Sequence, residues 1–240
     1  MALSILCPIM MAYFLISHGS SAPEPQAAMA FLCQQLISLG IVGWGTLEGE
    51  PLPKKIQAFS GQAQRQGVDR IVILPLFLLP GNHVVVDLPQ AIASTESGLP
   101  LELLTFLGGQ PLFQAWLQQA IAEGSAHILL GHGSRRPEVL PWFEELSQAC
   151  GVLPALLAQE GSLGRAIEMR IAQGYTSSRI YSYFLFGGRI LAQLHAQVPP
   201  LQAQYPQHRL SLLSAIQPTA SFINVIQQIL KAAAVVERVA

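Results

Sequence analysis

Two histidines stand directly after apolar runs, and their type and placement make them the best candidates for chemistry in this chain. His18 follows the run at residues 12–17, and His83 follows the run at residues 71–79 after a Pro-Gly-Asn turn. Two neutral imidazoles with open coordination positions suit a borderline divalent metal such as Co, Fe, Ni or Zn. A structural site normally has four ligands, so a pair indicates a metal that is held briefly and handed on. Spacing alone leaves open the alternative that each ring only hydrogen-bonds the backbone of its own loop.

Short apolar runs and longer amphipathic runs alternate along the chain and predict the elements that position these histidines. The expected strands lie at residues 12–17, 42–48, 70–78, 101–106, 126–131, 152–158, 179–186 and 210–215. The expected helices lie at residues 24–39, 52–66, 85–94, 111–123, 137–149, 163–173, 189–204 and 218–236. This alternation predicts an α/β fold of two similar half-domains, each a four-stranded parallel sheet with helices on both faces. The first and third strands of such a sheet commonly lie side by side, so both rings are expected above one sheet edge.

The motif around the first histidine returns in the second half of the chain. Residues 15–20 (Leu-Ile-Ser-His-Gly-Ser) are echoed by residues 129–134 (Leu-Leu-Gly-His-Gly-Ser), and Gln-Pro recurs at the start of a helical pattern in each half. Ordered matches of this kind indicate a duplication. We therefore predict two domains: residues 1–123, a half that carries the active site, and residues 124–240, a degenerate repeat.

The second half departs from the first where the second histidine would stand. The first half reads Pro-Gly-Asn-His at residues 80–83, whereas the second reads Gly-Gly-Arg-Ile at residues 187–190, so His132 has no histidine partner. We predict one working site per chain, with the second half forming a wall that supplies cations. The remaining histidines, which we expect to be structural or surface residues, are His127, His195 and His208.

Composition and missing motifs exclude several classes of function. The charged fraction is 11% and the net charge is −1, without a basic run that could hold a phosphate backbone, so we expect no nucleic-acid partner. The sequence has no P-loop, no dinucleotide-binding GxGxxG motif and no GxSxG nucleophile elbow. A histidine phosphatase would need cationic donors around its nucleophile, and His18 is followed by Ser-Ser-Ala-Pro.

The apolar amino-terminal stretch indicates neither a membrane anchor nor an export signal. Residues 1–16 are nearly all apolar, but the stretch contains Pro8 and falls short of the roughly 20 residues that cross a bilayer. It also lacks a basic n-region, so we expect no membrane partner and a cytoplasmic location. Cys7, Cys33 and Cys150 form no CxxC pair and are expected to be free thiols.

Three segments of the first half together resemble the sirohydrochlorin chelatases, the ATP-independent class II tetrapyrrole chelatases. They are residues 15–20, residues 48–51 (Glu-Gly-Glu-Pro) and residues 74–89 (Leu-Pro-Leu-Phe-Leu-Leu-Pro-Gly-Asn-His-Val-Val-Val-Asp-Leu-Pro). The resemblance covers most of residues 12–123 and, more weakly, the second half, as in the long two-half members. It implies insertion of Co2+ or Fe2+ into sirohydrochlorin in cobalamin or sirohaem biosynthesis, a lyase activity. The alternative is a carrier that binds tetrapyrrole or metal without catalysis.

The resemblance also implies what the protein works with. The metal is a substrate, so no permanently bound cofactor is expected, and the partners are sirohydrochlorin and the divalent metal. The chain is expected to act as a monomer or a homodimer.

The family's site residues carry over onto matching positions of this sequence. His18 and His83 match the metal-binding and catalytic histidines, and His18 also matches the acceptor of a pyrrole proton, a task that suits an imidazole near neutral pH. We predict Glu50 as a third catalytic residue, with Glu48 beside it contacting substrate; the alternative for both is a solvated loop. The other predicted substrate-binding residues are Leu79, Pro80, Gly81, Asn82, Val84, His132, Arg135 and Arg189.

Two features of these residues suit a flat, acidic macrocycle. Pro80 and Gly81 would let the backbone approach the ring closely. Sirohydrochlorin carries eight carboxylates, so cations should line the cleft rim, and the candidates are Arg135, Arg136 and Arg189.

Overall fold

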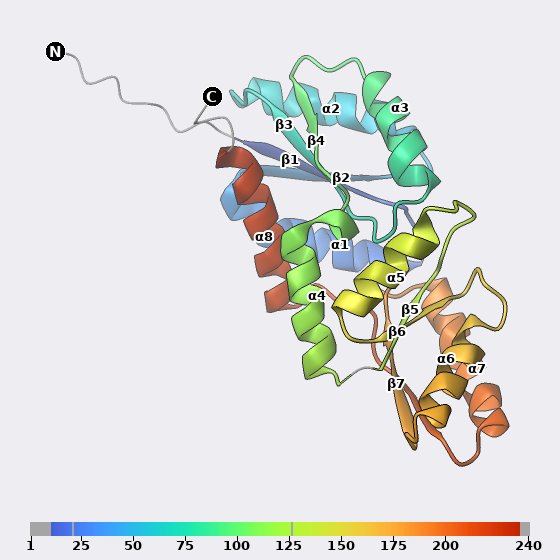
Figure 1. Cartoon of the computed structure of the whole chain (residues 1–240). Helices are drawn as coiled ribbons and strands as arrows, with labels where there is room; N and C mark the ends of the chain where they lie inside the picture. The colour runs from blue at the N-terminus through green and yellow to red at the C-terminus, as the bar shows by residue number, and fades with distance from the viewer. Residues whose placement is uncertain (1–10, 21, 126, 236–240) are drawn as a thin grey trace.

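The computed structural model describes residues 11–20, 22–125 and 127–235, which form two parallel sheets of four strands each. The first sheet has the order β2-β1-β3-β4 and the second β6-β5-β7-β8, with all strands parallel (Figure 1). The strands are β1 (Ala12–Ser17), β2 (Ile41–Thr46), β3 (Ile71–Pro75), β4 (Leu101–Leu103), β5 (Ile128–Gly131), β6 (Leu153–Leu156), β7 (Ser177–Ser182) and β8 (Arg209–Leu212). The predicted α/β class with two similar sheets is confirmed, and β1 and β3 are neighbours as expected.

Helices connect successive strands, as the parallel order requires. They are α1 (Pro23–Leu36), α2 (Leu52–Arg65), α3 (Leu88–Ala93), α4 (Pro111–Glu123), α5 (Val139–Ala149), α6 (Ser162–Ala172), α7 (Arg189–Gln204) and α8 (Ala220–Val235). Two 3-10 turns, Ile37–Leu39 and Leu107–Gly109, and a π-helical turn, His83–Asp87, complete the set. α1, α2 and α4 carry proline in the first helical turn, where its missing N–H would have no partner in any case. Among the described residues no helix is both long and apolar enough to cross a bilayer.

Six of the eight strands end two to four residues earlier than the apolar runs predict, and β3 and β7 show the reason. β3 ends at Pro75 rather than at residue 78, and β7 ends at Ser182 rather than at residue 186. The residues that follow remain apolar because they pack between the halves: Leu76 and Phe186, for example, are buried in the core that both halves share. The apolar character therefore extends beyond the strands into the walls of the central interface.

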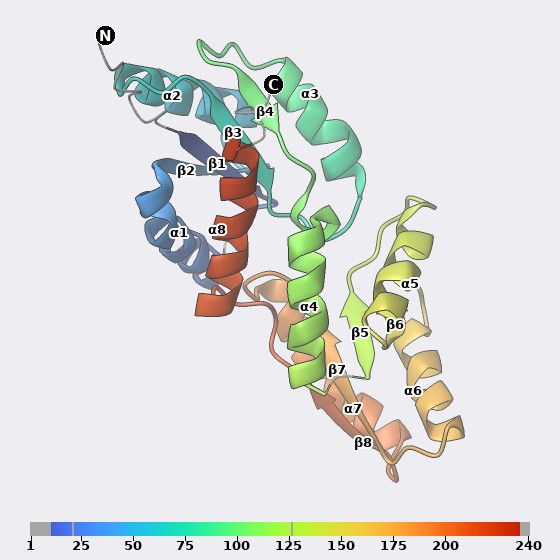
Figure 2. The same cartoon turned by 60° about the vertical axis from the view of Figure 1, so that its left-hand side comes forward.

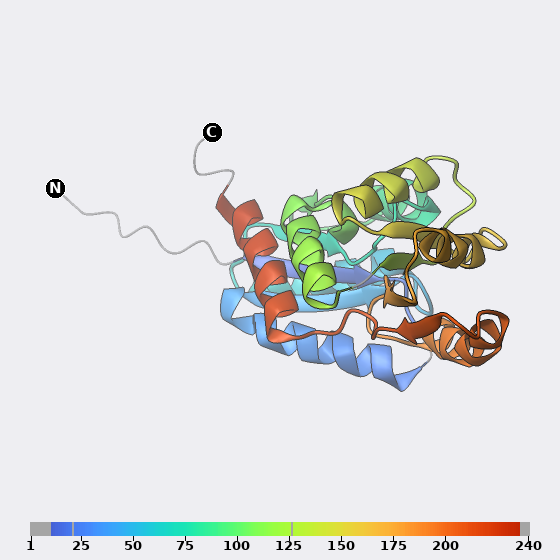
Figure 3. The same cartoon turned by 60° about the horizontal axis from the view of Figure 1, so that its bottom comes forward.

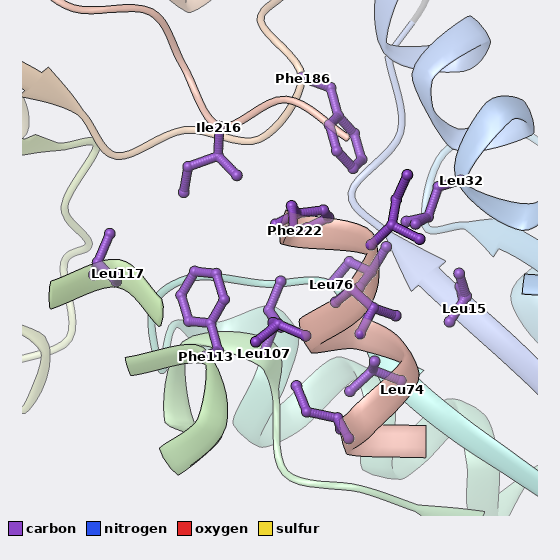
Figure 4. Close-up of a cluster of buried hydrophobic side chains, with 14 of the residues drawn as sticks. Leu15, Leu32, Leu74, Leu76, Leu107, Phe113, Leu117, Phe186, Ile216 and Phe222 are labelled. Atoms are coloured by element: carbon purple, nitrogen blue, oxygen red, sulfur yellow. The ribbon is translucent and has the colours of Figure 1, made fainter. Parts of the chain in front are cut away.

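Three hydrophobic clusters show how the helices cover the two sheets. One cluster lies under α2 and α3 on the outer face of the first sheet, and another lies under α6 and α7 on the outer face of the second. The third is shared, because the inner faces of both sheets pack against α1, α4, α5 and α8 between them (Figure 1). Figure 4 shows this cluster, in which Leu15 and Leu74 of the first half meet Phe186 and Phe222 of the second.

The carboxyl-terminal helix α8 belongs to the second half in sequence but packs against the first half. It contacts α1, β3 and α4, and Figures 2 and 3 show it alongside α4. Arg70 donates a hydrogen bond to the carbonyl oxygen of Ala233 (3.2 Å), and Gln227 donates one to the carbonyl oxygen of Gln35 (3.2 Å). α8 therefore ties the end of the chain to the first sheet.

We expect the two described cysteines to resist alkylation in the folded protein. Burial raises the pKa of the Cys33 thiol to about 12 and that of Cys150 to about 11, so the reactive thiolate is scarce at neutral pH. Both are free thiols, whereas Cys7 lies outside the described residues. Iodoacetamide labelling followed by peptide mass spectrometry should find both cysteines protected without denaturant and modified in guanidinium. Fast labelling of Cys33 in the native protein would contradict this expectation.

Candidate metal and tetrapyrrole site

Adjacent strands bring the two predicted histidines together. β1 pairs with β3, and His18 directly follows the last residue of β1. His83 lies at the start of the π-helical turn beyond β3. Their ring centroids are 4.9 Å apart and the rings meet edge to face at 74°. The predicted convergence of the two rings above one sheet edge is confirmed.

This ring separation fits two imidazoles that share one cation. A zinc-like ion lies about 2.0–2.1 Å from each imidazole nitrogen, which places the ring centroids roughly 5 Å apart around a tetrahedral centre. Among the described residues, no group of three or more His, Cys, Asp or Glu side chains is arranged to hold a metal ion. The pair thus offers two nitrogens and leaves other coordination positions open to a second binder of the metal.

Asp87 fixes the orientation of His83, and the sequence analysis did not include it among the site residues. The π-helical turn places Asp87 four residues after His83, on the same helical face, and its Oδ2 lies 2.6 Å from Nδ1 of the ring. A proton on Nδ1 is donated to this carboxylate, which leaves the lone pair on Nε2 available for a metal. The sequence placed His83 in a loop and began the helix at residue 85. The His-x-x-x-Asp spacing is the signal that would have identified the pair.

A tight turn places His18 beside the end of β2. Gly19 has φ 103°, a left-handed conformation that favours glycine, and an added Cβ would lie only 3.0 Å from Cβ of Glu48. Oε1 of Glu48 is 3.6 Å from Nδ1 of His18, and both side chains are more than half exposed. Lys55 donates hydrogen bonds to Thr46 and to the Glu48 carbonyl oxygen, which hold this end of β2.

The two rings line a cleft of about 750 Å³ between the halves. The predicted site residues in its wall, besides the two histidines, are Glu48, Leu79, Gly81, Asn82, Val84, His132, Arg135 and Arg189. Pro80 and Glu50 do not line this cleft, and neither does Arg136. Apolar residues that the sequence analysis did not single out also form the wall, including Met29, Trp44, Phe77 and Phe184.

The structure gives no special steric role to Gly81. An added Cβ there would meet the Ser134 Oγ at 3.8 Å, an ordinary contact, and its φ is not in the left-handed region. The close approach of the backbone to a macrocycle at Gly81 therefore stays a prediction.

The turn of the second half keeps its histidine but has lost both partners of that histidine. Gly133 repeats the left-handed conformation of Gly19 with φ 85°, and its added Cβ would meet Cβ of Ala158 at 2.9 Å. Ala158 therefore stands where the first half has Glu48, and Ile190 stands where it has His83. His132 lines the cleft, where its Nδ1 lies 3.1 Å from the carbonyl oxygen of Gly133, and among the described residues it makes no ion pair or ring contact like those of His18.

The other histidines lie outside the cleft. His208 is 2% exposed and pairs with the Ser178 hydroxyl and the Tyr175 carbonyl oxygen, and His127 accepts a hydrogen bond from the Arg179 backbone. His195 is exposed on α7.

Known proteins share both the sequence pattern and the fold. The chain is 25% identical over 246 residues to the sirohydrochlorin ferrochelatase of Bacillus subtilis (strain 168), which covers 90% of this chain and 91% of that protein. The structure of SirB from Bacillus subtilis with Fe3+ has a TM-score of 0.72 at 24% identity, covering 95% of this chain and 97% of SirB. The sirohydrochlorin chelatase SirB from Bacillus subtilis subspecies spizizenii, in complex with cobalt, has a TM-score of 0.71 at 19% identity with the same coverage.

The family comparison reproduces the internal repeat. The CbiX family model matches residues 12–124 and again residues 126–233, so the family unit occurs twice. The resemblance to the sirohydrochlorin chelatases that the motifs predict is thereby confirmed. With nearly its whole length matched in two copies, the chain belongs to the CbiX family.

Proposed function

We propose that this protein inserts Co2+ or Fe2+ into sirohydrochlorin without ATP. The observation that carries the proposal is the His18 and His83 pair, with ring centroids 4.9 Å apart in the wall of a cleft of about 750 Å³. The similarity along nearly the full chain to a sirohydrochlorin ferrochelatase supports the choice of substrate.

The proposed reaction uses the open coordination of the pair. Nε2 of His83 holds the metal while Asp87 holds the proton on Nδ1. Metal insertion releases two pyrrole N–H protons: His18 is the base that accepts one of them, and the other passes to solvent in the open cleft. One nitrogen cannot hold a metal and a proton together, so His18 releases the metal as it takes up the proton. Glu48, 3.6 Å from the His18 ring, passes the proton towards solvent, a role that its position favours over Glu50.

The cleft wall suits the shape and charge of the macrocycle. Apolar side chains such as Trp44 and Phe77 line it beside the histidines and offer flat contact surface. Arg135 and Arg189 come from the second half and bind the peripheral carboxylates by charge-assisted hydrogen bonds. The cations and the histidines thus stand on opposite halves, and substrate bridges them.

Anaerobic turnover of sirohydrochlorin with Co2+, Fe2+ and Ni2+ side by side tests the proposal. The expected result is a shift in the absorption of the macrocycle, with at least one of Co2+ and Fe2+ inserted much faster than without protein. Tight binding of the metallated product without any rate enhancement would contradict the proposal and indicate a carrier instead.

We expect the Asp87→Asn variant to lose about 10- to 100-fold in metal affinity or activity, the usual effect of removing a carboxylate that orients a ligating histidine. The amide keeps the size of the side chain but removes the charge that fixes the Nδ1 proton of His83. Co2+ titration and insertion kinetics measure the loss. Asp69→Asn is the matched control, because it makes the same change on the exposed turn before β3, where neither quantity should move. An Asp87→Asn variant that behaves like Asp69→Asn would contradict the expectation.

A further inference from the structure

We propose that the second half of the chain positions His83, through hydrogen bonds from Tyr183 and Arg136 to the segment that carries it. The proposal rests on the proposed function, because it takes His83 to be a metal ligand. Tyr183 and Arg136 are positioning residues in this proposal, since neither needs to touch the metal.

The segment at residues 76–82 connects β3 to the helical turn of His83, and both halves hold it. The first half contributes the backbone N–H of Gly108, which donates to the carbonyl oxygen of Phe77 (2.9 Å). The second half contributes the hydroxyl of Tyr183, which donates to the carbonyl oxygen of Leu78 (3.2 Å). The middle of the segment is therefore fixed from two sides.

Tyr183 has a side-chain hydroxyl, whereas the equivalent residue of the first half is a leucine, Leu76. It stands directly after β7, as Leu76 stands directly after β3, and the two backbones donate to equivalent carbonyl oxygens, of Leu130 and Ile16. The Tyr183 side chain is 2% exposed and packs against Phe143 with ring centroids 5.8 Å apart. Burial raises the pKa of Tyr183 well above its usual value, so the hydroxyl remains a donor at working pH.

Arg136 holds the other end of the segment. Its Nη1 donates to Oδ1 of Asn82 (3.3 Å), the residue directly before His83, while its Nε lies 3.4 Å from Oε2 of Glu138. By the alignment of the two His-Gly-Ser turns, Arg136 stands where the first half has Ala22. Both cross-half donors are thus side chains that the second half has and the first half lacks at the matching position.

The consequence is a pre-organised ligand. His18 is fixed by its tight turn within the first half, but His83 lies beyond a seven-residue connection whose position depends on the docked second half. Only conformers in which the connection holds the two rings together can bind the metal through both. The apparent metal affinity therefore falls in proportion to the fraction of protein in such conformers. The degenerate half thereby contributes to metal binding without a ligand of its own.

The test compares Tyr183→Phe with Tyr181→Phe. The first change removes the hydroxyl that reaches Leu78 and keeps the packed ring. Tyr181 is a buried tyrosine two residues earlier on β7, and among the described residues its hydroxyl makes no hydrogen bond to the segment. We expect Tyr183→Phe to weaken Co2+ binding, followed by Co2+ absorption without macrocycle, about fivefold, the effect of one lost hydrogen bond. Tyr181→Phe should bind Co2+ like the unaltered protein.

Arg136 provides a second variant pair that does not disturb the core. Arg136→Met should weaken Co2+ binding about fivefold, and Arg136→Lys, which keeps a cationic donor, should restore most of it. The spectrum of the Co2+-saturated protein should stay the same in Tyr183→Phe and Arg136→Met, because the bound geometry is unchanged and only the fraction of competent conformers falls. Lost stability alone would not weaken Co2+ binding at temperatures well below unfolding, nor would Arg136→Lys restore it.

The outcomes separate this proposal from the proposed function. Unaltered protein that neither binds Co2+ nor inserts it would overturn the proposed function. Unaltered protein that is active, with Tyr183→Phe and Arg136→Met both matching it in Co2+ affinity, would overturn the positioning role alone.

Discussion

Replacing His18 with alanine is expected to slow metal insertion by roughly 100-fold or more, the lower end of the contribution of a positioned general base. In the proposed reaction, the variant loses both a nitrogen for the metal and the acceptor of the pyrrole proton. It should fold normally, because the His18 side chain is 57% exposed and contributes nothing to the core. The rate is measured from the absorption change of sirohydrochlorin under anaerobic conditions, and the fold from circular dichroism and thermal unfolding.

A surface histidine supplies the control for this variant. His195→Ala makes the same substitution on the exposed face of α7, outside the main cleft, and should retain the activity of the unaltered protein. Near-normal turnover in His18→Ala would remove the basis for assigning the reaction to the histidine pair.

The Phe222→Ala substitution is expected to lower the free energy of unfolding by about 3–5 kcal/mol, the usual loss for a buried phenylalanine. Phe222 lies in the first turns of α8 and is completely buried. Its ring meets Phe113 and Trp116 of α4, with centroids 6.5 and 5.5 Å away, and Phe186 at 6.0 Å. The cavity would open inside the core that both sheets share (Figure 4), so the substitution should destabilise both halves.

Phe31→Ala is the matched control, because Phe31 is 45% exposed on α1 and its truncation should change stability by no more than about 0.5 kcal/mol. Urea unfolding followed by circular dichroism measures both variants. A loss below about 1 kcal/mol for Phe222→Ala would contradict the shared core, since a buried phenylalanine that leaves a cavity normally costs several times more. A single cooperative transition would further indicate that the predicted domains at residues 1–123 and 124–240 unfold together.

The fold could be predicted from the sequence to within a few residues at most element boundaries. Proline in the first turns of helices, apolar strand runs and the repeated His-Gly-Ser turn are local signals, and they indicated parallel sheets in two similar halves. The errors lie where burial has another cause than strand pairing: Leu76, Leu78 and Leu79 follow β3 and stay apolar because they pack in the core that both halves share.

The candidate site was predictable in its histidines but not in their supports. Sequence order places His18 and His83 after neighbouring strands, and parallel pairing then brings them together. The sequence did not predict the role of Asp87, because the helical turn that pairs it with His83 begins earlier than the expected helix. Glu48 could not be preferred to Glu50, because both follow the same strand. Choosing between adjacent carboxylates requires the direction of each side chain, which spacing in a loop does not specify.

The sequence by itself determined the strand and helix order, the duplication and the identity of the candidate histidine pair, because these depend on periodicity and on residue type. Only the tertiary structure decided that α8 crosses to the first half and that Tyr183 and Arg136 reach the loop of His83. The hydrogen bonds from Arg136 and Tyr183 to this loop join residues that are 54 and 105 positions apart in the sequence. Such pairs form only when the two sheets dock on their shared core, so no local pattern in the sequence predicts them.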